Sequence, residues 1–536
     1  MKSNGFRALR EYQKINHFPG SFQLGRKDRF WRNISRMQTR FGKKEFGFVP
    51  QTYIMPWDKK LLKNAWEEGS SKQKFILKPP ASARGIGIRV IHKWNQVPLK
   101  KAVIVQKYLS RPYLINGSKF DLRLYVYVTS FDPLRIYLFE DGLVRFATCK
   151  YSSSMKHLSN RYMHLTNYSI NKKSGEFQQN DDATVCQGHK WSLKALWGHL
   201  QEQGVNTDKI WEQMKDTVIK TIISVEQFTN SLVKSNCRRR YCCHELFGFD
   251  IMLDDKLRPW VLEVNISPSL HSNSPLDVEI KGPMVRDMFN LAGFLVPDKR
   301  QILANAPTPS TGTGTTVSAA ASFSQDKRKQ GQEISTDSRA KHTYFAQHHK
   351  QMDESELTSL MLDTLTINDI RILVESENEN ARCGEFQRIF PSVNKKYLHY
   401  FEHPRYYNFL LHTWEQKYRH QHMRGYSLLE SFCRKGLHLP AELTHVPPDH
   451  IWSVSTINNK QYVSPRPDNR PPPLIKSPPT SIFYNHHVNN PLTPSRLPSA
   501  KEESTDDITN TMNRLIVTSK SLVPVTSVKL RQSPGK

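Results

Sequence analysis

Three side chains with oxygen donors lie close together in the segment GFDIMLDDKLRPWVLEVN, residues 248–265. Its alternation of apolar and polar residues is typical of two strands joined by a turn. The period of two places Glu263 and Asn265 on one face of the second strand, and pairing of the strands can bring Asp250 beside them. Carboxylate and amide oxygens suit Mg²⁺. The sequence therefore predicts a magnesium site; the alternative is the solvated face of a hairpin.

A candidate phosphate-binding loop lies in FILKPPASARGIGIRVI, where two short strands flank a loop of small residues that contains Arg84, Gly85 and Gly87. Glycines let a backbone approach a phosphate closely, and its N–H groups can bind anionic oxygens. Lys78 ends the first strand and can neutralise a phosphate charge. The loop is neither a Walker A sequence nor a G-x-G-x-x-G fingerprint, so an ordinary hairpin turn is the alternative.

Two later strands also carry polar side chains. The apolar run 102–105 leads into Gln106–Leu109, where the backbone groups of a hinge could bind adenine. KFDLRLYVYVTS then alternates an apolar face with a charged face formed by Lys119, Asp121 and Arg123. These three charges either line a site or face solvent.

The segment HLTNYSIN, residues 164–171, has many polar groups and little regular periodicity. Thr166 and Asn167 could hold a nucleotide or a metal-bound water. The alternative is a turn in which these side chains bond to their own backbone.

The chain changes character along its length. Residues 1 to about 300 alternate apolar runs with turn residues and are expected to fold. Small polar residues dominate 301–350, which predicts a flexible linker. Helical periodicity returns in 351–436, and the Pro- and Ser-rich stretch 437–536 is predicted to be a disordered basic tail.

Composition limits the class of protein. Lysine and arginine outnumber aspartate and glutamate by 77 to 49, and a net charge of +28 implies an anionic partner or a basic solvated tail. The seven cysteines have no regular spacing, which favours free thiols in a reducing compartment. Neither a signal peptide nor a transmembrane run is found, so a soluble cytosolic protein without membrane contact is expected.

In sequence order, KPPASARGIGI, QKYL, KFDLRLY, HLTNYSIN and FGFDIMLDDKLRPWVLEVNISPSL resemble motifs of the tubulin tyrosine ligase-like family, especially its glutamylating members. The resemblance covers about residues 10–300, from INHFPGSFQLGRKD onwards. It implies an α+β ATP-grasp fold, in which two subdomains clamp ATP between antiparallel sheets. The ligase core would be 56–300, and 1–55 would be the remnant of an N-terminal domain, because few residues precede INHFPGS.

The resemblance also implies roles for single residues. ATP would be held by Lys78, Arg84, Gly85, Gln106, Lys107, Tyr108, Leu109, Lys119, Asp121, Thr166 and Asn167. The family cofactor would be two magnesium ions, bound by Asp250, Glu263 and Asn265. The incoming glutamate would be bound by Arg145, Tyr168, Ser169, Lys190 and Lys281. The catalytic roles would fall to Lys78, Arg84, Arg145 and Glu263.

The implied reaction joins free L-glutamate to glutamate side chains in the C-terminal tails of tubulin, through an acyl-phosphate made with ATP. Such a polyglutamylase would be a monomer in the cytoplasm, on microtubules and in cilia or basal bodies, and other acidic proteins would be further substrates. The alternatives are a glycine or tyrosine ligase of the same family and a non-catalytic microtubule-binding protein that keeps the ligase fold.

Region 351–436 mixes charged and aromatic residues. Its cations are Lys395, Lys396, Arg405, Lys417, Arg419 and Arg424, and they are interleaved with Tyr397, Tyr400, Tyr406, Tyr407 and Trp414. No helix-turn-helix, zinc-finger or RRM signature is present, which argues against nucleic acid. The resemblance implies a cationic microtubule-binding region, and a solvated helical face is the alternative.

Cysteines also gather before the magnesium hairpin, at Cys237, Cys242 and Cys243, with His244 next to them. Adjacent cysteines rarely both reach one metal, and no C-x-x-C pair is present. The sequence therefore argues against a zinc site here.

Overall fold

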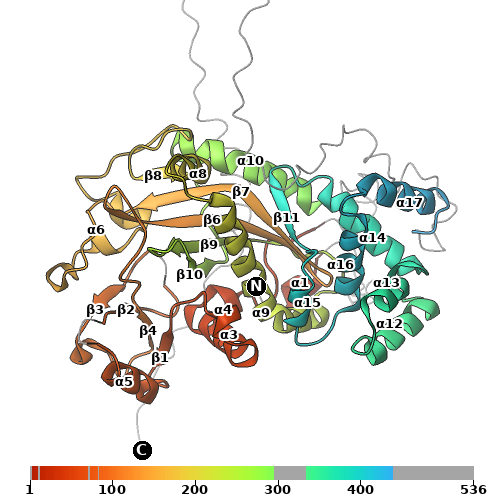
Figure 1. Cartoon of the computed structure of the whole chain (residues 1–536), viewed down its shortest axis with the longest axis horizontal. Helices are drawn as coiled ribbons and strands as arrows, with labels where there is room; N and C mark the ends of the chain where they lie inside the picture. Colours follow the sequence, from red (N-terminus) through yellow and green to blue (C-terminus); the bar gives the residue numbers. More distant parts are fainter. Residues whose placement is uncertain (1–2, 10–12, 71–72, 83, 295–333, 439–536) are drawn as a thin grey trace, which may run out of the picture. The chain divides into compact units, whose positions relative to one another are not determined.

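The computed structural model describes residues 3–9, 13–70, 73–82, 84–294 and 334–438, which all fall in one compact unit. Within these ranges the strands form two antiparallel sheets (Figure 1). The small sheet has the order β1-β4-β2-β3. The main sheet has the order β10-β9-β6-β7-β11, with β5 pairing with β6 and β8 pairing with β7.

The strands are β1 (Thr52–Met55), β2 (Phe75–Lys78), β3 (Arg89–Ile91), β4 (Val103–Lys107), β5 (Leu114–Ile115), β6 (Ser118–Phe131), β7 (Leu134–Phe146), β8 (Lys190–Ser192), β9 (Glu245–Leu253), β10 (Pro259–Asn265) and β11 (Phe386–Phe390). The α-helices up to residue 294 are α1 (Ser3–Arg7), α2 (Phe22–Gly25), α3 (Lys27–Phe41), α4 (Lys43–Phe46), α5 (Lys59–Glu67), α6 (Arg161–His164), α7 (Tyr168–Asn171), α8 (Leu193–Glu202), α9 (Thr207–Asn236) and α10 (Pro275–Ala292). The α-helices from residue 334 onwards are α12 (Thr336–His348), α13 (Glu354–Leu362), α14 (Ile367–Asn380), α15 (Lys396–His399), α16 (Tyr406–Tyr418) and α17 (His422–Arg434).

The small sheet carries different side chains on its two faces. Phe75 and Leu77 of β2 pack with Leu62 of α5 in one apolar cluster. Ile76 and Lys78 alternate with them and therefore point the other way. The predicted phosphate-binding lysine is thus placed on the face that does not pack against α5.

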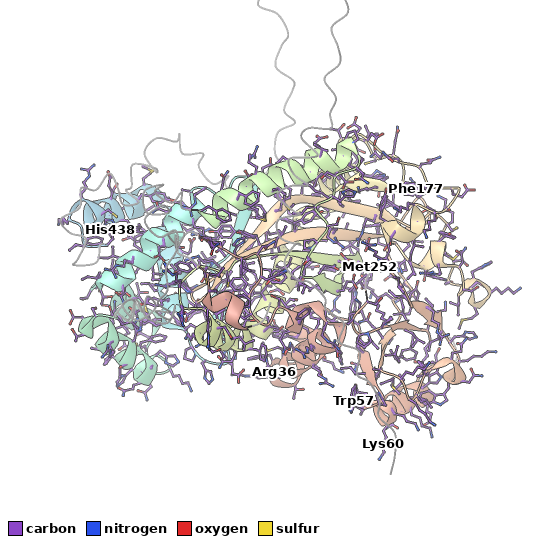
Figure 2. The ribbon with its side chains drawn as sticks, turned by 180° about the vertical axis from the view of Figure 1, so that it is seen from behind. Arg36, Trp57, Lys60, Phe177, Met252 and His438 are labelled. Atoms are coloured by element: carbon purple, nitrogen blue, oxygen red, sulfur yellow. The ribbon has the colours of Figure 1, made fainter. Side chains whose placement is uncertain are left out.

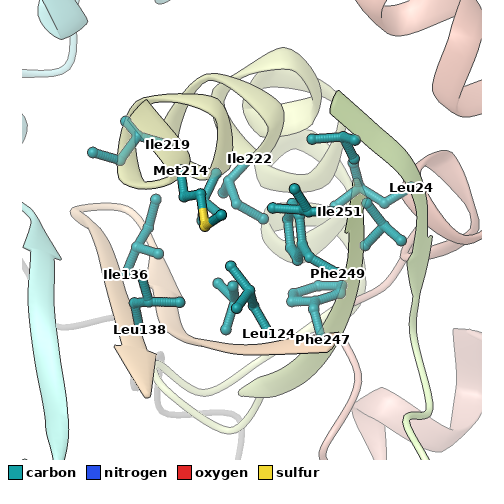
Figure 3. Close-up of a cluster of buried hydrophobic side chains, with 14 of the residues drawn as sticks. Leu24, Leu124, Ile136, Leu138, Met214, Ile219, Ile222, Phe247, Phe249 and Ile251 are labelled. Atoms are coloured by element: carbon teal, nitrogen blue, oxygen red, sulfur yellow. The ribbon is translucent and has the colours of Figure 1, made fainter. Parts of the chain in front are cut away.

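The main sheet is covered by helices on both faces. Leu122, Leu124 and Val126 of β6 belong to the large core, whereas Tyr125 and Tyr127 belong to a second cluster formed with α10. Figure 3 shows Leu124 packed toward α9, together with Phe249 and Ile251 of β9. The period of two along β6 therefore fills both layers.

Helix α9 supports the main sheet over a length of 30 residues. It begins after Asn206, whose side chain accepts a hydrogen bond from the Lys209 N–H at 2.9 Å. Met214, Ile219 and Ile222 face the sheet (Figure 3). Each of these side chains is almost fully buried, so a change to Ala would cost about 2–5 kcal/mol.

The region after the predicted linker does not form a separate layer of helices. Its strand β11 extends the main sheet, with Phe386 opposite Phe139 and Phe390 opposite Ile136 of β7. The short segment EFQRIF has no pattern that separates it from a helix, so the sequence did not indicate this strand. The main sheet is thus completed by residues about 120 positions beyond β10.

The structure changes two of the predicted boundaries. Strand β1 pairs with β4, so the residues just before 56 belong to the small sheet rather than to a separate N-terminal remnant. Helix α12 occupies 336–348, inside the stretch predicted as a flexible linker. Its start is capped by Ser335, and Phe345 is buried. The rest of that linker up to 333, and the predicted tail beyond 438, lie outside the described residues.

Most aromatic members of the predicted stripe are not on the surface, whereas four of its six cations are exposed. Tyr397, Tyr400, Tyr406 and Trp414 are buried, because the aromatic positions face the protein interior. The Tyr400 hydroxyl donates to Glu45 at 2.6 Å, and this contact joins the C-terminal helices to α4. The exposed cations are Lys395, Lys396, Lys417 and Arg424.

None of the helices in the described ranges combines the length and the apolarity that a membrane crossing requires.

Candidate active site

A cleft lies between the two sheets and encloses about 620 Å³, including its open mouth. It is lined by Lys78, Gln106, Lys107, Tyr108, Leu109, Lys119, Asp121, Thr166, Asn167, Asp250 and Glu263, all predicted site residues. Ile76, Ile88, Met252 and Leu262 add apolar surface. Figure 2 labels Met252 of β9, which belongs to the main sheet, and Trp57 and Lys60, which lie in the part of the chain that carries the small sheet.

Lys78 is held at the cleft by a chain of hydrogen bonds. Its Nζ donates to Gln106 Oε1 at 2.7 Å, and Gln106 Nε2 donates to Thr52 Oγ1 at 2.9 Å. Burial lowers the pKa of Lys78 to about 8, while Glu263 opposes the shift. An anionic ligand would restore full protonation, so the site favours phosphate over a neutral group.

Lys119 projects from β6 into the same cleft. Its Nζ donates to the His164 carbonyl oxygen at 2.9 Å and to the Tyr108 hydroxyl at 3.2 Å. Burial lowers the pKa of this lysine to about 7, and the nearby Asp121 opposes the shift. The charged face of β6 is therefore buried and paired rather than exposed to solvent.

His164 is a cleft residue that the sequence did not single out. Its Nδ1 lies 2.9 Å from the Tyr108 hydroxyl, and its Nε2 lies 3.0 Å from the His157 carbonyl oxygen. Burial, followed by the charge of Lys119, lowers its pKa to about 4. The neutral imidazole thus orients Tyr108 at the hinge. Its position at the start of HLTNYSIN was the available sequence signal.

Two arginines and two aspartates form a buried cluster at the base of the cleft. Arg123 Nε lies 2.6 Å from Asp250 Oδ1, and Arg145 Nη2 lies 3.0 Å from Asp250 Oδ2. Arg145 Nε also donates to Asp121 at 2.9 Å. Burial opposes ionisation of Asp250, yet both arginines hold its pKa below the usual range. Asp250 is therefore a carboxylate at neutral pH.

The predicted metal donors share one face of the β9–β10 pair. Glu263 lies directly opposite Asp250, and Asn265 lies opposite Gly248. The Asn265 amide donates to the Gly248 carbonyl oxygen at 3.2 Å, so its own oxygen remains an acceptor. Lys27 Nζ lies 2.8 Å from Glu263. Each carboxylate oxygen has two lone pairs, so these ion pairs leave acceptor capacity, and the donor set fits Mg²⁺.

The predicted phosphate loop is docked on the HLTNYSIN segment. Arg84, Gly85 and Gly87 all have positive φ, and a Cβ on Gly85 would lie 2.4 Å from Ile170 Cδ1. Arg161 donates to the Gly85 carbonyl oxygen at 2.8 Å. Among the residues that the structure describes, Arg84, Gly85 and Asn265 are not part of the lining of the cleft.

The predicted glutamate-binding cations meet on one side of the buried arginine–aspartate cluster. Arg145 of β7 lies opposite Lys190 of the neighbouring strand β8, and Lys190 Nζ lies 5.4 Å from the Tyr168 ring centroid. Asp277 of α10 accepts from Lys190 and lies 2.8 Å from Lys281 Nζ. Although burial opposes it, the two lysines lower the pKa of Asp277.

Ser169 is placed differently from the other predicted glutamate ligands. Its hydroxyl donates to the Arg84 carbonyl oxygen at 3.2 Å, so it fixes the phosphate loop. Asp277 was not predicted, because its role depends on where α10 crosses the main sheet. The structure thus brings Arg145, Tyr168, Lys190 and Lys281 together through contacts that the sequence does not show.

A comparison with protein-family models decides the family. The model described as the tubulin-tyrosine ligase family matches residues 6–303, more than half of the chain. The chain belongs to the tubulin-tyrosine ligase family. Its two antiparallel sheets and the cleft between them have the α+β ATP-grasp architecture that the motifs predicted, which is confirmed.

Several curated relatives of this family member are tubulin-modifying enzymes by name. The chain is 58% identical over 457 residues to tubulin monoglutamylase TTLL4 of Mus musculus, covering 85% of this chain and 38% of that protein. It is 40% identical to tubulin polyglutamylase ttll-4 of Caenorhabditis elegans over 81% of this chain and 69% of that protein. With tubulin polyglutamylase TTLL5 of Mus musculus the identity is 40%, over 76% and 30% of the two chains. The chain spans less than two-fifths of the length of the mouse TTLL4 protein.

Proposed function

We propose that this chain is an ATP- and Mg²⁺-dependent ligase that adds glutamate to glutamate side chains in the C-terminal tails of tubulin. One observation carries the proposal. The cleft contains lysines that suit phosphate and carboxylates that suit a metal ion, and Arg145 links it to the neighbouring cations that are predicted to bind glutamate. The names of the relatives, tubulin monoglutamylase and polyglutamylase, supply the substrate class.

The nucleotide would lie with its base against the hinge and its phosphates at Lys78 and Lys119. Ile76, Met252 and Leu262 give the apolar surface that an adenine ring needs. The two lysine ammonium groups neutralise phosphate charge inside a cleft of low dielectric, where a cation is worth more than in water. Asp250, Glu263 and Asn265 would hold Mg²⁺, which neutralises charge on the transferred phosphoryl group.

The reaction would proceed in two displacements. A tail carboxylate oxygen attacks the terminal phosphorus of ATP, and ADP leaves. The amine of free glutamate then attacks the acyl carbon of this acyl-phosphate, inorganic phosphate leaves, and the amine nitrogen loses a proton. Negative charge develops on oxygen in both steps, and Arg145 stands between the two sites where it develops.

Selection of glutamate would depend on Lys190 and Lys281. Asp277 holds both lysines in place. The three side chains together carry one net positive charge, which can attract an incoming carboxylate. Glycine lacks the side-chain carboxylate and would gain less from this charge. Tubulin binding itself would use the exposed cations of the C-terminal helices, which suit acidic tails. An association with cytoplasmic and ciliary microtubules follows from that substrate.

The test is mass spectrometry of tubulin tails after incubation with the purified chain, ATP, Mg²⁺ and equal amounts of glutamate, glycine and tyrosine. We expect glutamyl additions with the wild-type chain and none with Glu263→Gln. Glycyl or tyrosyl additions would contradict the donor assignment. Binding to microtubules without any addition would contradict the proposed ligase and favour a non-catalytic binding protein.

A further inference from the structure

Three cysteines far from the ATP cleft place their sulfur atoms together. Cys237 follows the last turn of α9, and Cys242 and Cys243 lie just before β9. The Sγ atoms of Cys237 and Cys243 are 3.5 Å apart, and those of Cys242 and Cys243 are 3.8 Å apart. All three sulfur atoms lie within 4.8 Å of one another, and all three thiols are free.

The two adjacent cysteines do reach one point, because their sulfur atoms lie 3.8 Å apart although Cys243 forms a β-bridge with Ile15. In an extended strand Cys242 and Cys243 would point to opposite faces. Tyr241, directly before them, has a φ of +57°, which is rare for a bulky residue. Arg135 and Arg240 lie 4.6 and 4.9 Å from the centroid of its ring and fix this conformation. The objection drawn from the sequence therefore does not apply to this segment.

The spacing of the sulfur atoms fits a tetrahedral metal ion. A Zn–S bond of about 2.3 Å gives sulfur atoms about 3.8 Å apart in a tetrahedral site. Cys242 and Cys243 are buried, whereas Cys237 is half-buried and leaves an approach from solvent. The His244 ring packs edge-on against Tyr127 and Phe294, so we do not include it among the ligands.

We propose that Cys237, Cys242 and Cys243 form a binding site for one thiophilic divalent ion of the Zn²⁺ class, with a fourth position open. Three thiolates and one divalent ion leave a single negative charge. Soft sulfur ligands select this class of ion over Mg²⁺, so the site is chemically separate from the carboxylates of the cleft.

The bound ion would fasten three segments of the chain. Ile15 N donates to the Cys242 carbonyl oxygen at 2.8 Å, and His244 N donates to the Ile15 carbonyl oxygen at 3.0 Å. The ion would therefore tie the end of α9 and the start of β9 to the N-terminal segment. Its role is structural, because β9 carries Asp250 to the active site from this anchored end.

Metal titration of the whole chain tests this site. The reduced, chelator-treated and desalted chain is titrated with Co²⁺, and thiolate-to-cobalt absorption is recorded. We expect one Co²⁺ per chain, displaced by Zn²⁺. Cys237→Ser and Cys243→Ser should each weaken binding by roughly 100-fold. The control Cys383→Ser, which changes a thiol outside the cluster, should leave it unchanged.

A second measurement needs no substitution, so a poorly folding variant cannot obscure the outcome. Zn²⁺ should protect Cys237, Cys242 and Cys243 of the wild-type chain from alkylation, mapped by mass spectrometry, and should not protect Cys383. The proposal is overturned if the reduced chain shows no thiolate-to-cobalt absorption, or if both cluster variants bind Co²⁺ as tightly as wild type. Equal alkylation with and without Zn²⁺ would also overturn it.

Discussion

Buried arginines have different roles at the two ends of the main sheet. In the cleft, Arg123 and Arg145 pair with Asp250 beside a cavity that admits a ligand. At the far end, Arg135 of β7 pairs with Glu379 of α14 at 3.0 Å, and neither side chain reaches solvent. The Thr129 hydroxyl also donates to Glu379 at 2.6 Å. Residue type alone therefore does not mark a site, because the neighbouring space decides whether a buried charge can act on a ligand.

The two ends of the main sheet should also differ in how they tolerate the loss of one charged side chain. Removing one charge at the far end leaves the other enclosed by protein. Removing one charge at the cleft leaves a group that water and ligands can reach. We therefore expect the first kind of change to affect stability and the second to affect activity.

The largest effect on stability is expected for Arg135→Met. This change leaves Glu379 as an unpaired buried charge, so the free energy of unfolding should fall by about 3–5 kcal/mol. Denaturant unfolding monitored by circular dichroism measures the loss. The double change Arg135→Met with Glu379→Gln should recover part of it. If the single variant is as stable as wild type, the contrast between the two ends of the sheet does not hold.

Asp250→Asn should act chiefly on catalysis. The amide keeps the volume of the side chain but removes the charge that Mg²⁺ requires. We expect kcat to fall by roughly 10²–10³-fold, with a smaller loss of stability than for Arg135→Met. Steady-state glutamylation of tubulin, paired with thermal unfolding, separates the two effects. Near-normal turnover in a folded variant would exclude Asp250 from the metal site.

The affinity for ATP should depend on pH through Lys119. Its pKa in the free chain is about 7, so binding a phosphate above that pH requires uptake of a proton. Between about pH 7 and 8, below the pKa of Lys78, the Kd for ATP should rise by up to roughly tenfold per pH unit. Lys119→Arg keeps its charge and should flatten this part of the profile, as measured by calorimetry between about pH 6 and 8. An unchanged slope in that variant would assign the titration to another group.

The same group acts on stability with the opposite sign. Unfolding returns Lys119 to its ordinary pKa of 10.5, so the unfolded chain binds more protons between about pH 7 and 10.5. This lysine therefore contributes a free energy of unfolding that rises with pH in that window, by up to about 1.4 kcal/mol per unit. It contributes no such slope below pH 7, where both states are protonated.

The smallest effect is expected for the exposed cations of the C-terminal helices. Lys417→Glu and Arg424→Glu should each weaken binding to microtubules by a few-fold, and less so at high salt. The matched change Lys156→Glu alters an exposed lysine of the ligase core and serves as the control. Co-sedimentation at two salt concentrations measures the difference. Equal losses in all three variants would indicate non-specific attraction.

Local spacing predicted the part of the site that is formed by neighbouring strands. The alternation along the second strand places Glu263 and Asn265 on one face, but Asp250 lies opposite Glu263 only because the register shifts between Val261 and Glu263, which the sequence pattern does not show. Lys27, which pairs with Glu263, was not predictable, because it comes from a helix more than two hundred residues earlier. Asp277 was missed for the same reason.

Long-range packing also decides which residues of 351–436 are exposed. The aromatic residues of this region are mostly buried and four of its six predicted cations are exposed, a division that the sequence pattern alone does not give. Likewise, the sulfur atoms of Cys242 and Cys243 lie 3.8 Å apart, although adjacent residues of a strand point to opposite faces. The positive φ of Tyr241 just before them is not indicated by the sequence either.

Strand β11 has a consequence for how the protein is made. The edge of β7 around Tyr137 and Phe139 gains its partner only when residues 386–390 have been synthesised. Ribosomes add roughly 5–20 residues per second, so the nascent ligase sheet exposes an unpaired apolar edge for several seconds after β10 has emerged. Chaperones that shield such edges should therefore associate with ribosomes that have translated past β10 but not yet β11.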